Sequence, residues 1–148
     1  MIGLIQRVAS AEVRVDGAVV GAISRGVLAF IGVRREDTEA TAARLLERLL
    51  DYRIFPDAEG RMNLSTRETG AGLLLVPQFT LAADTRKGTR AGFSSAADPA
   101  TARQLFEYLL GRARSSYAPV SAGVFGAHME VSLINDGPVT FWLEATAG

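Results

Sequence analysis

Two runs of this chain are almost entirely apolar, and they limit the possible folds more than any other feature. The runs are VLAFIGV (27–33) and GLLLVPQFTL (72–81). Neither reaches the roughly 18 apolar residues that suggest a membrane-spanning helix. Each is instead typical of a strand buried on both faces, which requires a covering layer on each side of the sheet.

Each apolar run is followed by a segment whose period is helical. In DTEATAARLLERLLDYRIF (37–55), with Asp37 or Thr38 as the N-cap, one helical face carries Ala42, Leu45, Leu46, Leu49 and Leu50. The second helix begins at Asp98-Pro99, a cap followed by a first-turn proline, and its apolar face carries Ala102, Leu105, Phe106, Leu109 and Leu110. We predict a turn at residues 55–62 and a long loop at 82–97.

The two ends of the chain carry strand patterns. Asp16-Gly17 is a strong two-residue hairpin signal between an alternating N-terminal segment and AVVGAIS (18–24). The last strands are expected in VFGAHMEVSLI (124–134) and VTFWLEA (139–145). We therefore predict an α/β fold of the mixed α+β type, in a single domain covering residues 1–148. Its elements follow the order ββ-βα-βα-βββ, as mixed, mostly antiparallel β-sheets with two helices packed on one side.

The segment 124–134 also predicts a partner. One of its faces carries Phe125, Ala127, Met129, Val131 and Leu133. The other face is only half polar and carries Val124, Gly126, His128, Glu130, Ser132 and Ile134. Two helices on one side cannot cover a sheet this apolar, so we expect a second subunit to cover the rest.

Composition excludes several classes of function. Sixteen basic side chains balance sixteen acidic ones, so sequence-blind coating of nucleic acid is not expected and DNA is not a predicted partner. The absence of cysteine rules out disulfides and thiolate metal sites and fits the cytoplasm. One histidine, His128, cannot form a metal site alone, and no metal or cofactor is predicted. The start, MIGLIQRVAS, shows no secretory pattern, and no membrane association is expected.

The segment VPQFTLAADTRKG carries candidate catalytic groups. Gln78 and Thr80 close the second apolar run, and the N–H groups of Gln78, Phe79, Thr80 and Leu81 become available donors where the strand frays. An ordinary strand-end role for the two polar side chains is the alternative. A Thr80 nucleophile would need a base, and nothing in the sequence puts His128, the only imidazole, beside it. A Ser/His/Asp-type hydrolase is therefore poorly supported.

A small basic cluster follows in the same loop. It consists of Arg86, Lys87 and Arg90. Such a cluster is either a solvated loop or a contact for one or two phosphates at the end of a nucleic acid.

The segment NDGPVT (135–140) interrupts the last strands. A two-residue turn on Asp136-Gly137 would need the N–H of residue 138, and Pro138 has none. Glycine adopts backbone angles closed to other residues, and an X–Pro bond becomes cis at a cost of only about 0.5–1 kcal/mol. The pair is therefore either a rigid corner with exposed carbonyls or a longer loop with an incidental proline.

Taken together, these segments resemble the D-aminoacyl-tRNA deacylases over nearly the whole chain. The matching segments are IQRV (5–8), YRIFPDAEGRMNLS (52–65), QFTLAADTRKG (78–88) and VSLINDGPVTFWLE (131–144). The resemblance implies a cytoplasmic homodimer with two active sites at the subunit interface. It also implies a carboxylic ester hydrolase for translation quality control, which releases a D-amino acid, or glycine, from the terminal adenosine of mischarged tRNA. The partner would be the 3′ end of aminoacyl-tRNA.

The resemblance also assigns roles to residues. It implies catalytic roles for Gln78, Phe79 and Thr80, substrate contacts for Gly137, Pro138, Leu81, Met129 and Arg7, and tRNA phosphate contacts for Arg86, Lys87 and Arg90. The Gly-Pro pair, cis in the family, would enter the partner's site and hold the substrate's α-amino group with its carbonyls. An L side chain would then clash with the main chain. The family motif Ser-Gln-Phe-Thr-Leu begins here with Pro77, so no role of that serine carries over.

Two mechanisms remain open at this point. In one, Thr80 attacks the ester. In the other, water attacks with help from the 2′-hydroxyl of the tRNA, and N–H groups near Phe79 and Thr80 stabilise the oxyanion. We favour the second because the chain supplies no evident base. A non-catalytic module that binds the tRNA end and a general esterase or peptidase are the alternative classes.

Overall fold

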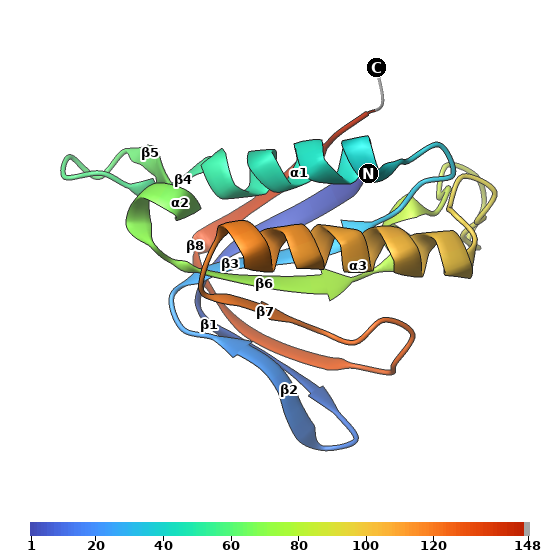
Figure 1. The fold of residues 1–148 in the computed structure, drawn as a ribbon, viewed down its shortest axis with the longest axis horizontal. Coiled ribbons are helices and arrows are strands. Elements are labelled where there is room, and N and C mark those ends of the chain that lie inside the picture. The colour runs from blue at the N-terminus through green and yellow to red at the C-terminus, as the bar shows by residue number, and fades with distance from the viewer. Residues whose placement is uncertain (147–148) are drawn as a thin grey trace.

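A six-stranded sheet with two long helices forms most of the molecule (Figure 1). The structure, a computed structural model, describes residues 1–146. Its strands are β1 (Ile2–Val15), β2 (Ala18–Ile23), β3 (Gly26–Gly32), β4 (Arg53–Pro56), β5 (Met62–Ser65), β6 (Gly72–Pro77), β7 (Val120–Ala122) and β8 (Glu130–Glu144). Its helices are α1 (Glu39–Asp51), α2 (Thr66–Thr69), α3 (Pro99–Ser116) and the 3-10 helix η1 (Phe79–Ala82). The predicted mixed α+β fold is confirmed.

The sheet is mixed and mostly antiparallel, as expected. Its order is β2-β1-β3-β6-β7, with β8 paired to β1. The pairs that involve β1 are antiparallel, whereas β3–β6 and β6–β7 are parallel. The hairpin between β1 and β2 turns at Asp16 and Gly17, whose φ angles of 50° and 79° suit a tight two-residue turn.

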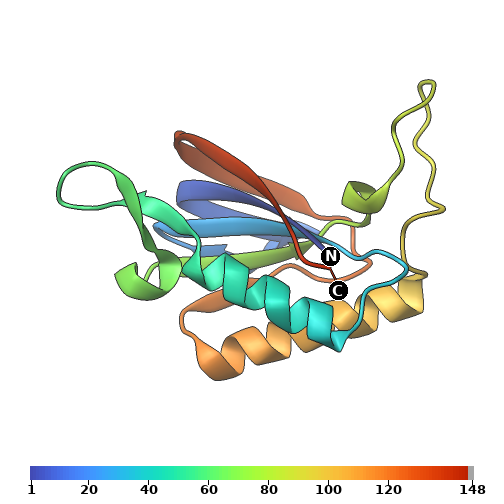
Figure 2. The same cartoon turned by 90° about the horizontal axis from the view of Figure 1, so that it is seen from above.

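Helices α1 and α3 lie side by side on one face of the sheet, as Figure 2 shows from above. The hydroxyl of Thr38 caps α1 by accepting from the Thr41 N–H, and the Asp98 carboxylate caps α3 with Pro99 in the first turn. The apolar faces of both helices pack on alternate residues of β3 and β6, such as Val27, Ala29, Leu73 and Leu75. These contacts confirm the predicted helix periods.

The opposite face of the sheet carries a smaller apolar cluster. It consists of Val8, Ala11, Val13, Ile23, Leu28, Leu74 and Val76, with Phe30, Met129, Val131 and Leu133 packed against it. The other side of β8 is exposed, and Ile134 and Trp142 there keep 62% and 50% of their surface accessible. The alternation predicted for 124–134 is therefore present. No helix within residues 1–146 is long and apolar enough to cross a membrane.

Three local predictions were wrong, and the short elements between residues 53 and 69 were missed. The second apolar run does not stay extended to residue 81, because the strand β6 ends at Pro77 and η1 follows. The penultimate strand does not begin at 124 but at Glu130, and it forms one strand, β8, with the last segment. The turn predicted at 55–62 is present at 57–61, but the strands β4 and β5 on either side of it and the helix α2 that follows were not predicted. Their runs of four residues are too short to show a period.

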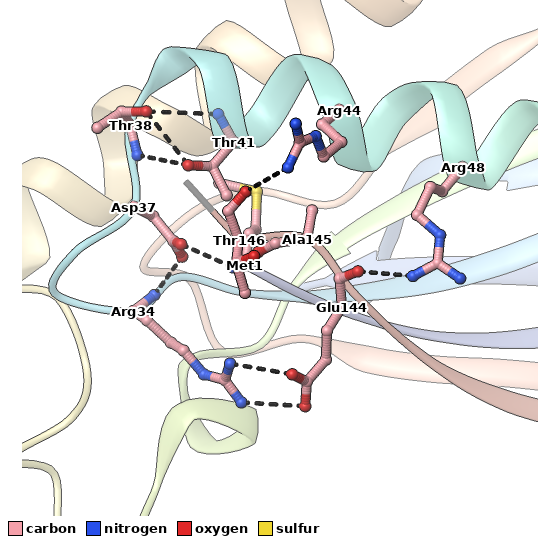
Figure 3. Close-up of polar contacts among 10 residues, drawn as sticks. All are labelled: Met1, Arg34, Asp37, Thr38, Thr41, Arg44, Arg48, Glu144, Ala145 and Thr146. Atoms are coloured by element: carbon pink, nitrogen blue, oxygen red, sulfur yellow. Dashed lines mark hydrogen bonds and ion pairs between the residues drawn. The ribbon is translucent and has the colours of Figure 1, made fainter. Parts of the chain in front are cut away.

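The N-terminal ammonium group is buried and fixes three elements to one another (Figure 3). The Met1 nitrogen lies 2.7 Å from Oδ1 of Asp37 and 2.7 Å from the carbonyl oxygen of Ala145. The second carboxylate oxygen of Asp37 accepts from the Arg34 N–H at 2.6 Å. Around this pair, Arg34 binds the carboxylate of Glu144, which lowers the pKa of Glu144. The start of β1, the start of α1 and the end of β8 therefore meet at one charged contact.

Candidate active site

An apolar cavity of about 430 Å³ lies at the carboxyl end of β6. It is bounded by the end of β6, the first turn of α3 and the segment that leads into β8. Its lining residues include Gln78, Phe79 and Met129, three of the predicted site residues, together with Phe125 and His128. Sulfur Sδ of Met129 accepts from the Val124 N–H at 3.4 Å, which fixes the methionine at the cavity wall.

Pro77 and Gly32 explain why the chain turns at this cavity. Pro77 is the last residue of β6 paired with β3, and it has no N–H to extend the ladder. The chain then folds into η1, which packs against Gly32. A Cβ at that glycine would lie 2.8 Å from Cβ of Leu81, so only glycine allows this close approach.

The turn leaves two backbone donors free. The Gln78 N–H donates to the Ile31 carbonyl at 2.8 Å, and the Leu81 N–H donates to the Gln78 carbonyl at 3.3 Å. The prediction that the N–H groups of Gln78 and Leu81 would be available donors is therefore wrong. Within residues 1–146, the N–H groups of Phe79 and Thr80 have no acceptor. These two successive donors begin a helical turn beside the cavity, which is an arrangement suited to a developing oxyanion.

The Thr80 side chain has no base beside it. Its hydroxyl oxygen accepts a short hydrogen bond from Nε2 of Gln78, and the residue is exposed. His128 lines the cavity, but no hydrogen bond joins it to Thr80 among the described residues. The geometry therefore does not supply the activated hydroxyl that nucleophilic catalysis requires.

The Gly-Pro pair forms the tip of an excursion from the long strand β8. Asn135 pairs with Val8 and Thr140 pairs with Gln6, so the four residues between them are displaced from the ladder opposite Arg7. The Gly137-Pro138 bond is cis, and both residues are exposed.

Two side chains hold this corner in place. Asn135 accepts from the Val139 N–H at 2.7 Å and donates to the Val139 carbonyl at 3.2 Å, closing the corner from inside. Nε of Arg7 donates to the Asp136 carbonyl at 2.9 Å, and Nη1 donates to the Ile54 carbonyl at 2.8 Å. Asn135 was not predicted. Its signal in the sequence is an amide side chain just before an Asp-Gly-Pro run, where Asn commonly bonds its own backbone.

The corner at Gly137-Pro138 and the turn that starts at Gln78 lie apart within one chain. The cross-strand row that contains Asn135 passes through β1 and β3 and reaches β6 at Gly72, six residues before Gln78. At about 3.3 Å per residue along a strand and 4.8 Å between strands, Asn135 beside the corner lies roughly 25 Å from Gln78. In Figure 2 the red tip of β8 and the yellow-green turn lie toward opposite sides of the molecule. One protomer therefore does not unite these two groups of predicted site residues.

The remaining predicted residues lie at the edges of the turn. Leu81 lines a separate hollow with Arg34 and Trp142 rather than the cavity. Arg86 is 86% exposed and forms an ion pair with Asp84, whose oxygen Oδ2 lies 2.8 Å from Nη2 of Arg86. The hydrogen bond from this guanidinium lowers the pKa of Asp84 to about 2.

Lys87 and Arg90, the other two members of the basic cluster, are exposed. They have no ion-pair partner within the part of the chain that the structure describes, so their charges face solvent.

Comparisons with known proteins identify the family of the chain. The family model described as D-Tyr-tRNA(Tyr) deacylase matches residues 4–144. A D-aminoacyl-tRNA deacylase of Thioalkalivibrio sulfidiphilus is 67% identical over 97% of this chain and 97% of that protein. One of Alkalilimnicola ehrlichii is 67% identical over 98% of this chain and 97% of that protein.

Solved structures show the same fold. The c-Myc DNA Unwinding Element Binding Protein is 35% identical, has a TM-score of 0.94, and covers 99% of this chain and 100% of its own. A probable eukaryotic D-amino acid tRNA deacylase has a TM-score of 0.80 at 18% identity, covering 97% of this chain and 98% of its own, and supports the fold alone.

A mixed sheet with an apolar cavity and free backbone donors at one strand end suits a hydrolase that works without a catalytic triad. The chain belongs to the D-Tyr-tRNA(Tyr) deacylase family. It is thus an enzyme, a hydrolase of the D-aminoacyl-tRNA deacylase type.

Proposed function

We propose that the chain hydrolyses the ester between a D-amino acid, or glycine, and the terminal adenosine of a mischarged tRNA. Family membership supports this substrate class. The observation that carries the chemistry is the pair of unpartnered N–H groups at Phe79 and Thr80, next to a cavity of about 430 Å³. We also propose a cytoplasmic location, because a chain without cysteine fits a reducing compartment.

In the proposed mechanism, water attacks the ester carbonyl and no residue of the chain is acylated. The 2′-hydroxyl of the adenosine assists the attack, and the N–H groups of Phe79 and Thr80 stabilise the oxyanion. The Gln78 amide bonds the Thr80 hydroxyl and thereby positions the turn. The ester oxygen leaves as the 3′-hydroxyl of the tRNA.

The proposed filter for chirality is the corner at Gly137-Pro138. Its carbonyls bind the α-amino group of the substrate, so an L side chain points into main chain while a D side chain points to open space. The bonds from Asn135 and Arg7 support this role, because rejection by collision requires a corner that does not yield.

A shared site follows from the separation of the two halves. If the corner and the turn act on one substrate, the corner must come from a second copy of the chain. The exposed apolar side chains of β8 are consistent with such a contact. We therefore propose a homodimer with two interfacial sites.

One assay tests the activity and its selectivity. D-Tyr-tRNA, L-Tyr-tRNA and a simple ester are incubated with the protein, and release of the amino acid or acid is followed. We expect cleavage of the D ester only. Binding without cleavage would support the tRNA-end module instead, and cleavage of the simple ester would support a general esterase.

A matched pair of variants tests the oxyanion donors. Phe79→Pro removes one N–H at the first position of η1, where proline is tolerated, and should lower kcat by about 100- to 1,000-fold. Phe79→Leu keeps that N–H and is the control. Equal loss in both variants would show that the ring, not the donor, matters.

Subunit mixing tests the shared site. Gly137 has a φ of 151°, and a Cβ there would lie 2.8 Å from the Val139 nitrogen, so Gly137→Val distorts the corner. A mixed dimer of Phe79→Pro and Gly137→Val chains contains one intact site and one doubly altered site. Recovery of activity on mixing is expected, and no recovery would place the corner outside the partner's site.

The net charge of zero weighs against extended contact with tRNA or with DNA. We therefore propose that contacts stay near the tRNA 3′ end, with Arg86, Lys87 and Arg90 close to its phosphates. The binding activity in the name of the c-Myc DNA Unwinding Element Binding Protein is not part of this proposal.

A further inference from the structure

Two aromatic rings are exposed side by side at the base of the loop that carries Arg86, Lys87 and Arg90. Phe79 and Phe93 keep 61% and 46% of their surface accessible, and their ring centroids lie 5.4 Å apart with the planes tilted by 41°. A single exposed aromatic residue is common, but a joined pair is a platform with accessible π faces.

The pair borders a second hollow that continues from the first cavity. This hollow has a volume of about 620 Å³, and Phe79, Ala97 and Pro99 line both spaces. The Phe79 ring therefore forms the wall between them. A ligand that fills the first cavity and extends past this wall enters the second hollow.

One cation, Arg35, lines the hollow together with the rings. Arg35 lines the hollow, is exposed, and donates to the Ser94 carbonyl at 2.9 Å. No acidic partner of Arg35 lies within residues 1–146. Asp98 is an acidic residue of the lining, but its carboxylate accepts from the Thr101 N–H at the start of α3, where the helix dipole offsets its charge.

The loop that carries Lys87 and Arg90 is joined to the rings through Phe93, which directly follows Gly92. Asp84 and Gly92 exchange two backbone hydrogen bonds, of 2.7 and 2.9 Å, and form the stem of an arm. Lys87 and Arg90 lie on this arm between the two stem residues, six and three residues before Phe93 in the sequence. Aromatic faces followed by unpaired cations are typical of sites for single-stranded nucleic acid.

We propose that the Phe79–Phe93 hollow binds the nucleotide that precedes the terminal adenosine of the RNA 3′ end. Its base stacks on the rings, and a phosphate lies beside Arg35. This inference rests on the proposed function, because the terminal adenosine and its ester occupy the first cavity. A second copy of this chain is the competing occupant, and the charges around the rings favour the nucleotide over it.

Two minimal substrates separate the subsite from the catalytic centre. One is the D-tyrosyl ester of adenosine, and the other is the D-tyrosyl ester of the dinucleotide CpA. Wild-type protein should cleave the dinucleotide ester with the higher kcat/KM. Phe93→Leu should lower that value by about 10- to 100-fold, the usual effect of losing one base–aromatic stack, and leave the adenosine ester unchanged. Phe93→Tyr keeps a ring and should restore the advantage.

Binding provides a readout that needs no cleavage. Calorimetry should show tighter binding of CpA than of adenosine to wild type, and equal binding to Phe93→Leu. Arg35→Gln should reduce the salt dependence of CpA binding by about one phosphate contact. If no ester is cleaved but CpA still binds more tightly, the proposed function fails and the subsite stands.

Three results would overturn the subsite. Phe93→Leu could keep the full dinucleotide advantage, or it could weaken both esters equally. Its sedimentation could also shift toward a monomer, which would assign the rings to a contact between copies.

Discussion

Asp37 holds the Met1 ammonium where water does not reach, so its carboxylate should be among the most costly charges to remove. The two groups are 2.7 Å apart, with side-chain exposures of 0% for Met1 and 2% for Asp37. The same carboxylate accepts from the Arg34 N–H at 2.6 Å. Asp37→Asn keeps the shape but offers one oxygen to two donors. The amide NH2 group of the new asparagine then faces either the Met1 ammonium or the Arg34 N–H, and both of these are donors.

The magnitude follows from the burial. Breaking a buried pair by neutralising one partner costs about 3–5 kcal/mol, because the other charge is left uncompensated. For a chain of this size, each 1 kcal/mol lowers Tm by about 2–4 °C, so a fall of about 6–20 °C is expected. Asp51→Asn is the matched control. Its partner Arg67 is 40% exposed and Asp51 is 57% exposed, so a loss below about 1 kcal/mol is expected there.

Urea unfolding at pH 7, repeated at several protein concentrations, measures both variants. The concentration series is needed because the proposed dimer would make the midpoint depend on concentration. If Asp37→Asn and Asp51→Asn lost the same stability, the reasoning from burial would be refuted.

Three further predictions concern the site and its loop. Thr80→Ala keeps both N–H donors and loses one neutral hydrogen bond, so kcat should fall by about 10-fold or less; a fall to the uncatalysed rate with the fold intact would make Thr80 the nucleophile. Gly32→Ala puts a methyl 2.8 Å from Cβ of Leu81 and should cost about 1–3 kcal/mol and reduce kcat, whereas Gly111→Ala, which has open space, should not destabilise. Asp84 is titrated by carboxyl-carbon NMR. Because its pKa is lowered from 3.8 to about 2, its stabilising contribution is complete above pH 3.8 and lost as pH falls through about 2; a midpoint near 3.8 would contradict the ion pair.

The sequence predicts the sheet, the hairpin and both long helices because their signals are periodic and cumulative. The helix from Glu39 and the helix from Pro99 each carry a cap and an apolar face, so local and tertiary preferences agree. The end of the second apolar run could not be read in this way. Leu81 is apolar like the strand before it, and only the missing N–H of Pro77 and the space at Gly32 decide that the chain turns there.

The site was predicted by residue type more than by geometry. Resemblance placed Gln78, Phe79 and Met129 in one site, and the cavity brings them together. It could not show that the Gln78 N–H is already bonded, because that depends on the register of two parallel strands. Nor did it name Asn135, whose only signal in the sequence is an amide side chain just before an Asp-Gly-Pro run.

The buried ammonium of Met1 has a consequence for how the protein is made and handled. A formyl or acetyl group on that nitrogen would cancel its charge and add a carbonyl where Asp37 and the Ala145 carbonyl already lie at 2.7 Å. The contact of Met1 with Asp37 and Ala145 therefore requires an unmodified ammonium group on this nitrogen. Affinity handles for purification are better joined after β8 than ahead of Met1.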